Sequence, residues 1–173
     1  MLRKQILLAR RAFIGPPKQK ADRLIFQNIT HHQLYQNAKT ICTYVSLADE
    51  ADTHALIDNI LTKEDKTLVV PKIEGETITL YRIHSYADLE KGTLGILEPK
   101  KGCALATIET VDLFIVPGVA FGHDGTRIGM GKGYYDRLLA KTNATKIGIA
   151  YPFQIFDSIP TTDRDERVDL LIS

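Results

Sequence analysis

A glycine-rich stretch between residues 121 and 137, FGHDGTRIGMGKGYYDR, surrounds two cationic side chains, Arg127 and Lys132. Glycine occupies every second position from 129 to 133, and without a Cβ atom it can turn backbone N–H groups toward one point. The arginine fork matches two phosphate oxygens, and lysine adds a compact charge. The stretch therefore predicts an anion cradle, with a polyphosphate favoured over a carboxylate. The alternative is a glycine-rich turn whose cations face solvent.

The spacing within this stretch differs from the two common nucleotide-binding motifs. Thr126 stands where a Walker A motif has its first glycine, and Gly133 replaces the Ser or Thr that should follow Lys132. GMGKG is also not the dinucleotide fingerprint, because it reads GxGxG and lies late in the chain. Any nucleotide site here is of another type.

Asp136 follows the glycines, in the first turn of a predicted helix. A carboxylate in that position can complement the helix dipole. The sharper interpretation starts from the repulsion between a carboxylate and nearby phosphate oxygens, which a cation between them would relieve. Mg²⁺ prefers one or two carboxylates plus phosphate oxygens, so a magnesium nucleotide would reconcile Lys132 with Asp136.

Alternating strands and helices would position this loop. Apolar residues at helical spacing predict a helix from Leu2 that ends at GPP, and a second helix from about Lys18 to Tyr35. A third helix should open near Asp52 or Thr53 as N-cap, and a fourth should run from Gly133 to Thr142. Strands are predicted at 40–47, 66–73, 77–83, 111–118, 145–151 and 168–172.

This order of elements predicts an α/β fold, a three-layer α/β/α arrangement with a mainly parallel sheet, in a single domain spanning 1–173. Ligands of open α/β sheets collect outside the carboxyl ends of the strands. Both SLADEADT (46–53) and the glycine-rich stretch fall there. We therefore expect these two loops to share one site.

Composition excludes several classes of protein. With 44% hydrophobic and 25% charged residues and a net charge of +1, the chain is neither disordered nor built mainly to coat nucleic acid. We find no signal peptide and no membrane span, and read Cys42 and Cys103 as free thiols. We expect a cytoplasmic monomer or weak dimer that binds neither nucleic acid nor membrane. Residues 1–23 nevertheless carry seven basic side chains against one acid.

The stretch GTRIGMGKGYYDR (125–137) resembles the signature of the 5-formyltetrahydrofolate cyclo-ligases, also called 5,10-methenyltetrahydrofolate synthetases. Further support comes from the basic N-terminal helix and from SLADEADT, GTLGILEP, VPGVAF and DERVDLLI. The resemblance implies a fold similar to the sugar-phosphate isomerase and coenzyme A transferase group. It also implies ATP-dependent cyclisation of 5-formyltetrahydrofolate, with or without a polyglutamate tail, to 5,10-methenyltetrahydrofolate, ADP and phosphate.

The resemblance implies a role for particular residues. Lys132 and Arg127 would stabilise the transferring phosphoryl group. The ATP site would comprise Arg3, Arg127, Ile128, Gly129, Met130, Gly131, Lys132, Gly133, Tyr134 and Tyr135. The folate site would comprise Val45, Glu50 and Tyr134, and the magnesium ligands would be Asp136 and Asp165.

Several of these residues keep a simpler interpretation. Val45 could equally belong to the core, and Glu50 and Asp165 could be surface acids. The family's N-terminal lysine, four residues before its arginine, would fall before Met1, so either the chain begins short of it or Lys4 takes its place. A further hypothesis is that some of the cations Arg10, Arg11 and Lys18 steer the anionic folate toward the site.

The implied mechanism begins with attack of the formyl oxygen on the γ-phosphate, which gives an iminium phosphate. N10 then closes the ring and phosphate departs. Such chemistry requires positioning and charge stabilisation rather than a nucleophilic side chain. Two alternatives remain: a sugar-phosphate isomerase or transferase, and a non-catalytic nucleotide- or folate-binding protein.

Overall fold

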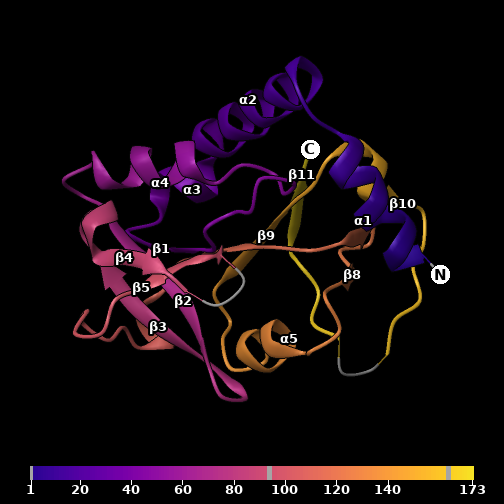
Figure 1. Cartoon of the computed structure of the whole chain (residues 1–173). Coiled ribbons are helices and arrows are strands. Elements are labelled where there is room, and N and C mark those ends of the chain that lie inside the picture. The colour runs from indigo at the N-terminus through magenta and orange to yellow at the C-terminus, as the bar shows by residue number, and fades with distance from the viewer. Residues whose placement is uncertain (1, 93–94, 163–164) are drawn as a thin grey trace.

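A six-stranded sheet forms the centre of the computed structural model, which describes residues 2–92, 95–162 and 165–173 (Figure 1). Its strand order is β11-β9-β6-β1-β2-β3. In chain order the strands are β1 (Thr40–Thr43), β2 (Thr67–Glu74), β3 (Thr77–Ile83), β6 (Leu113–Val116), β9 (Thr145–Ile149) and β11 (Leu170–Ile172).

All neighbouring strands in this sheet run parallel except β3, which forms an antiparallel hairpin with β2 at one edge. The strands in the middle read as continuous apolar runs, as expected for strands covered on both faces; Leu113–Val116 is buried throughout. The hairpin turns through Gly75 at φ 62°, a left-handed conformation that glycine adopts without strain. The structure thus confirms a mixed α/β fold with a mainly parallel central sheet.

One face of the sheet is covered by α2 (Pro16–His31), α3 (Gln33–Asn37) and α4 (His54–Leu61), as Figure 1 shows. The prediction of one continuous helix from Lys18 to Tyr35 was wrong. His32 is extended at ψ 136°, which ends α2, and its Nδ1 accepts a hydrogen bond from Leu34 N to start α3. The chain breaks there because α3 must turn to bury Tyr35 beside Asn59 of α4.

The sequence left Asp52 and Thr53 as alternative N-caps of α4, and the structure divides the role between them. Thr53 occupies the N-cap position but its side chain makes no cap hydrogen bond, because its hydroxyl donates to Tyr44 O at 2.7 Å. The Asp52 carboxylate instead accepts from His54 N and Ala55 N, both at 3.3 Å. Asp52 therefore satisfies the first free N–H groups of this helix.

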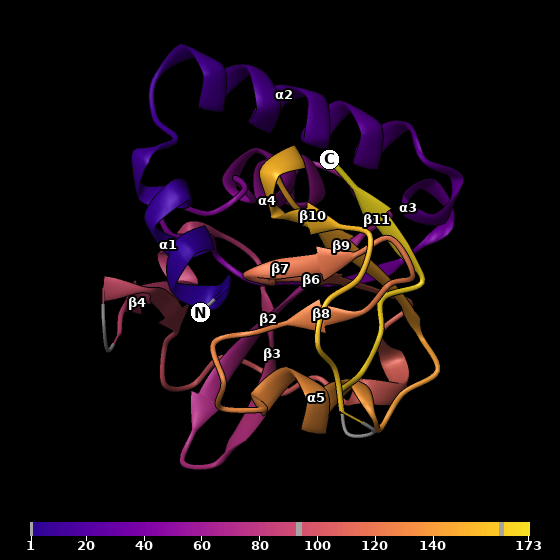
Figure 2. The same ribbon diagram turned by 90° about the vertical axis from the view of Figure 1, so that its right-hand side faces the viewer.

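A second, three-stranded sheet of order β10-β7-β8 lies against α1 (Leu2–Ala12), as Figure 2 shows. Its strands are β7 (Ala120–Gly122), β8 (Arg127–Ile128) and β10 (Ile155–Phe156). Ile6 of α1 packs on Val119 and Ala120. The sequence predicted no strand in the glycine-rich stretch, but β7 and β8 form an antiparallel hairpin that lies largely within it. Too short for a periodic signal, these strands were missed.

The opposite face of the central sheet carries α5 (Tyr134–Leu139), which buries Leu138 and Leu139 and is shorter than the predicted helix to Thr142. The remaining elements are β4 (Leu89–Lys91), β5 (Leu97–Pro99), η1 (Tyr86–Asp88), η3 (Ile108–Thr110) and η4 (Pro152–Gln154). None of the helices in the described part of the chain combines the length and hydropathy that a bilayer crossing requires.

Candidate active site

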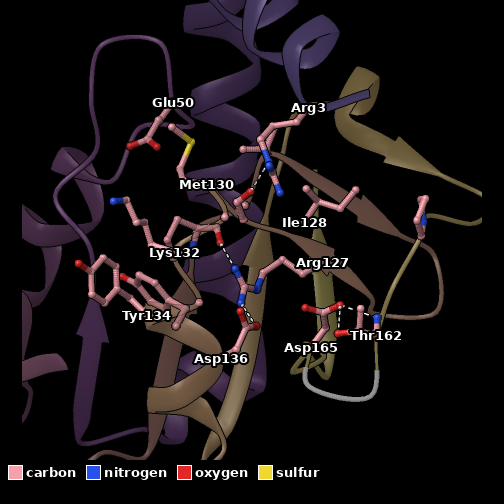
Figure 3. A pocket seen from close by; sticks show the side chains of 18 of the residues that line it. Arg3, Glu50, Arg127, Ile128, Met130, Lys132, Tyr134, Asp136, Thr162 and Asp165 are labelled. Carbon is pink, nitrogen blue, oxygen red and sulfur yellow. Dashed lines mark hydrogen bonds and ion pairs between the residues drawn. The ribbon is translucent and has the colours of Figure 1, made fainter. Parts of the chain in front are cut away.

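A cavity of about 500 Å³ opens where α1, the loop after β1, the tip of β2 and the glycine loop meet (Figure 3). Thirteen of the fourteen predicted site residues line it. These are Arg3, Glu50, Arg127, Ile128, Gly129, Met130, Gly131, Lys132, Gly133, Tyr134, Tyr135, Asp136 and Asp165. The predicted meeting of the SLADEADT loop with the glycine loop is therefore confirmed.

The glycine loop needs its glycines for backbone conformation and for space. Gly131 and Gly133 are left-handed at φ 94° and 66°, which other residues adopt only with strain. Arg3 of α1 donates from Nε to Gly129 O at 2.9 Å, and a Cβ on Gly131 would lie 3.2 Å from Arg3 Nη1. The first helix is thus fastened to the loop by its arginine. The side chain of Lys132 is exposed at the mouth.

Arg127, which is buried, and Asp136, which is partly exposed, form an ion pair in the wall of the cavity, and Figure 3 shows the two side chains pointing at each other. Arg127 is 4% exposed, and its Nη2 lies 2.5 Å from Asp136 Oδ1. Its Nη1 donates to Pro117 O at 3.5 Å, while its buried Nε has no hydrogen-bond partner within the described residues. The sequence suggested separate partners for these two residues, but the structure joins them.

The two candidate metal ligands are held by different contacts. Both described hydrogen bonds to Asp136, from Arg127 and from Glu166 N, end at Oδ1. Oδ2 would lie 4.0 Å from a Cβ on Gly133, so it is directed toward the loop. Asp165 Oδ2 accepts from Thr162 N at 2.6 Å and from Thr162 Oγ1 at 3.1 Å. The described residues contain no cluster of three or more His, Cys, Asp or Glu side chains that could hold a metal.

Glu50 occupies another wall, where the loop after β1 meets α1. Its Oε2 accepts from Leu47 N at 3.0 Å, and its Oε1 lies 3.5 Å from Arg10 Nη2. Burial raises the pKa of this carboxyl group above its usual value, although the Leu47 N–H and Arg10 oppose the change. The loop backbone is held too, because Tyr151 Oη lies 2.8 Å from Glu50 O.

The two tyrosines of the signature point to different surroundings. Tyr134 lines the cavity and donates from its hydroxyl to Gly75 O at 3.2 Å, which ties α5 to the β2–β3 hairpin. Arg137 donates to Glu76 O at 2.9 Å and strengthens the same connection. Tyr135 instead packs, partly buried, against the core cluster that contains Leu138 and Leu139, and desolvation raises the pKa of its hydroxyl well above its usual value.

Comparison with known proteins places this site in a family. The family model described as the 5-formyltetrahydrofolate cyclo-ligase family matches residues 1–173. The chain belongs to the 5-formyltetrahydrofolate cyclo-ligase family. Membership makes it a ligase of folate one-carbon metabolism, as the signature in the glycine loop implied.

Relatives of known name support the same assignment along the whole chain. A 5-formyltetrahydrofolate cyclo-ligase of Mus musculus is 30% identical over 97% of this chain and 89% of its own. One of Mycoplasma pneumoniae is 32% identical over 99% of this chain and 96% of its own. The correspondence therefore extends well beyond the glycine loop.

Solved structures agree with the fold. The 5,10-methenyltetrahydrofolate synthetase of Aquifex aeolicus superposes with a TM-score of 0.89 at 38% identity, covering 99% of this chain and 87% of that one. The synthetase of Mycoplasma pneumoniae gives 0.81 at 28% identity, covering 99% and 95%. The arrangement of elements around the cavity is thus that of cyclo-ligase structures.

Two candidates from the sequence lie away from the cavity. Val45 is 5% exposed within the main hydrophobic core and is not among the lining residues, which is the simpler of its two interpretations. Lys4 is exposed on α1 and does not line the cavity either, whereas Arg3 does. The structure thus gives Lys4 no place in the site.

Seven lining residues were not anticipated from the sequence. They are Arg10, Ile73, Pro117, Gly118, Val119, Pro160 and Thr162. VPGVAF contributed only to the resemblance, and the sequence suggested for Arg10 only a role in steering the folate. A signal for Arg10 existed, because it lies one turn after Ile6 on the buried side of α1.

Proposed function

We propose that this chain converts 5-formyltetrahydrofolate and magnesium ATP to 5,10-methenyltetrahydrofolate, ADP and phosphate within the cavity. One observation carries the proposal: a single cavity brings together the glycine loop with Lys132, two carboxylates, and Glu50 on a separate wall. A phosphate-binding surface and a surface rich in hydrogen-bond acceptors are what the two substrates require. The proposed catalytic unit is one domain spanning 1–173.

The carboxylates fit a magnesium nucleotide better than a metal held by protein alone. Mg²⁺ in such sites keeps several waters and takes one or two carboxylates together with phosphate oxygens. Asp136 and Asp165 line the cavity, and Asp136 presents Oδ2 toward the loop while Oδ1 is engaged. We propose that these two side chains hold the ion, which would neutralise charge on the phosphates.

Lys132 is the proposed stabiliser of the transferring phosphoryl group. It lies between two glycines of the loop, and no ion pair within the described residues engages it. An unpaired ammonium and preorganised backbone N–H groups stabilise charge that develops as the formyl oxygen attacks the γ-phosphate. The loop residues from Ile128 to Tyr135 would line the phosphates, with Arg3 holding the loop at Gly129.

Arg127 is proposed to act mainly through Asp136. One of its terminal nitrogens is engaged by the carboxylate, and the side chain is almost fully buried. It therefore positions a metal ligand and contributes positive charge to the wall. Its Nε has no partner among the described residues, but it is buried, so this donor is not presented to the cavity.

Glu50 and Tyr134 are the proposed folate contacts. A carboxylate accepts hydrogen bonds from adjacent N–H groups, which the amino and ring nitrogens of a pterin supply. The Tyr134 ring lines the cavity and its hydroxyl is already engaged by Gly75 O, so the ring face is what it offers to a ligand. After the formyl oxygen is phosphorylated, attack by N10 closes the ring and releases phosphate. Val45 would act only through the core beneath the loop.

The fold group also remains a proposal. We propose that the central sheet and its covering helices share the three-layer arrangement of the sugar-phosphate isomerase and coenzyme A transferase group. The cyclo-ligase resemblance supports this relationship, and the mainly parallel sheet is compatible with it.

A single assay tests the reaction. Purified protein is mixed with 5-formyltetrahydrofolate, ATP and Mg²⁺, and the near-ultraviolet absorbance of the methenyl product is followed together with ADP. We expect equal amounts of both, and neither when any one component is omitted. ADP without methenyl product, or binding without turnover, would instead indicate a non-catalytic or unrelated nucleotide site.

Glu50→Gln tests the assignment of the walls. The substitution keeps the size of the side chain but removes one acceptor charge, so the KM for 5-formyltetrahydrofolate should rise more than the KM for ATP. The reverse pattern would move Glu50 to the nucleotide half of the cavity.

A further inference from the structure

Arg10 is a buried cation that the proposed chemistry does not use. It lies in the last turn of α1, is 4% exposed, and lines the cavity beside Glu50. Its Nη2 donates to Asp49 Oδ2 at 2.9 Å and lies 3.5 Å from Glu50 Oε1. Its buried Nε has no hydrogen-bond partner among the described residues. The adjacent Arg11 is exposed, so burial is particular to Arg10.

These contacts argue against a role for Arg10 in steering substrate from a distance. A side chain that is buried and paired with two carboxylates adds little to the field outside the protein. Lys18 is likewise paired, with Asp22 at 2.8 Å. Of the three cations that the steering hypothesis named, only Arg11 is exposed. The ion pairs therefore favour Arg11 over Arg10 and Lys18 as a steering residue.

Burying a guanidinium is costly unless its donors are used, so the geometry of its partners shows what the burial achieves. The shorter contact goes to Asp49, which anchors the guanidinium. The longer one leaves Glu50 Oε1 beside a cation without a tight pair, so this oxygen can accept from a ligand. Leu47 N fixes the other oxygen.

The charged neighbours of Glu50 do not favour an ionised carboxylate equally. Arg10 and the Leu47 N–H favour the charged form, whereas burial and Asp49 oppose it. Tyr44, which is buried, and Tyr135, which is partly buried, also interact with its charge. The titratable groups facing Glu50 are Arg10 from α1, Asp49 from its own loop, Tyr44 after β1 and Tyr135 from α5. Arg10 is thus the one positively charged group in this set.

We propose that Arg10 is a positioning residue of the folate site, which orients the Glu50 carboxylate and keeps it ionised for a ligand edge with adjacent N–H donors. The inference rests on the proposed role of Glu50 as a folate contact. It adds that the basic N-terminal helix serves both substrates. Arg3 holds the phosphate loop, and Arg10, two turns later, holds the folate carboxylate.

The test measures kcat/KM for 5-formyltetrahydrofolate against pH, by folate-dependent ADP release, in variants with opposite charge changes. Arg10→Gln should move the acid limb of the profile to higher pH and raise the folate KM about tenfold at neutral pH, with the ATP KM nearly unchanged. Asp49→Asn should move the limb to lower pH. Arg10→Lys should keep the limb near that of the unaltered protein, and Arg11→Gln is the control for loss of charge alone.

Opposite shifts separate positioning from simple stabilisation. Both Arg10→Gln and Asp49→Asn break the same ion pair, so a purely structural role would lower the unfolding temperature in both and move both profiles in one direction or neither. Either result would overturn the inference. If Arg10→Gln does not fold, the Asp49→Asn and Arg10→Lys profiles decide.

Failure of the inference can be distinguished from failure of the proposed function. If Glu50→Gln binds 5-formyltetrahydrofolate with the same affinity as the unaltered protein, Glu50 is not a folate contact. The proposed role of Glu50, on which this inference rests, is then refuted. If Glu50→Gln raises the folate KM while the Arg10 and Asp49 variants leave the acid limb in place, only the positioning role is refuted.

Discussion

Each of the two walls of the cavity contains a buried arginine paired with carboxylates, but the number of carboxylates differs. On the phosphate wall, buried Arg127 faces one carboxylate, Asp136, at 2.5 Å. On the folate wall, buried Arg10 faces two, Asp49 at 2.9 Å and Glu50 at 3.5 Å. Each arginine keeps a buried Nε without a partner in the described part of the chain. The difference lies in how many carboxylates share one cation.

This difference sets the sign of charge that each wall offers. Arg127 and Asp136 are neutral together, and Arg3 and Asp165 add one charge of each sign, so the excess charge of the phosphate wall equals that of the Lys132 ammonium. One arginine and two carboxylates sum to −1, which leaves the folate wall an excess of acceptors. Cationic surface suits phosphate oxygens, and acceptor surface suits N–H donors. The shared cavity thus distinguishes the two substrates by charge.

Removing the unpaired cation should have the largest effect. Lys132→Ala is expected to lower kcat/KM for ATP by about 10²–10³-fold, as loss of one donor to a charged transition state does elsewhere. Steady-state kinetics with both substrates varied measures it. Lys141→Ala, an exposed lysine after α5, is the matched control. Turnover within a few-fold of normal in Lys132→Ala would mean that the glycine loop binds without stabilising the reacting phosphate.

The paired carboxylate of the same wall should matter for stability as well as for metal. Asp136→Asn leaves Arg127 buried beside a neutral partner, and loss of one member of a buried pair costs about 3 kcal/mol. Asp165 accepts hydrogen bonds from Thr162 and forms no ion pair with an arginine among the described residues, so Asp165→Asn leaves no such buried charge behind. Both variants should require more Mg²⁺ for half-maximal activity, but only Asp136→Asn should lose stability in urea titration. Equal metal titrations for both variants and the unaltered protein would contradict the proposed ligands.

Sequence reasoning predicted the site better than it predicted the elements around it. The glycine spacing indicated an anion site around Arg127 and Lys132, and the resemblance to the cyclo-ligases supplied most of the other lining residues. The sequence showed that α1 is basic, but it did not show which of its cations point into the protein and which point to solvent. Whether a cation faces solvent or the interior depends on what packs against the helix, here the second sheet at Val119 and Ala120.

Pairings between distant residues could not be read from one sequence. Arg127 and Asp136 were each assigned a ligand because their types suit phosphate and magnesium, and nothing local showed that they would meet. The same holds for the break at His32, where helical periodicity continued through a bend set by tertiary packing. The short strands β7 and β8 carry too few residues for a period to appear.

A substitution in the loop tests whether α1 serves the phosphate wall. Gly131→Ala places a methyl 3.2 Å from Arg3 Nη1 at φ 94°, which should displace the arginine and raise the ATP KM about fivefold. Gly102→Ala has a similar φ of 101° with nothing within 4 Å, so it carries the backbone strain alone, about 1 kcal/mol. Similar loss of stability in both variants, with an altered ATP KM only in Gly131→Ala, is the expected result. If the two variants had equal KM values for ATP, the contact of Arg3 with the loop would have no influence on nucleotide binding.

The smallest effect concerns stability on the folate wall. Burial raises the pKa of Glu50, so the folded protein holds this proton more tightly than the unfolded chain, and stability falls as pH rises from the usual glutamate range through the raised pKa. Glu50→Gln removes that loss. Its unfolding temperature should exceed that of the unaltered protein by a few degrees at neutral pH and match it in acid, measured by calorimetry across pH.

Glu74 provides the control of opposite sign for this last experiment. Hydrogen bonds from Thr79 and Tyr81 lower the pKa of its exposed carboxyl group, so its contribution is present at neutral pH and lost as pH falls through the lowered pKa. At neutral pH, the Glu74→Gln variant should therefore be as stable as the unaltered protein or less stable. If Glu50→Gln instead lost stability there, Glu50 would be a stabilising partner of Arg10. The folate wall would then resemble the tightly paired phosphate wall, and an excess carboxylate held ready for a ligand would be the wrong description.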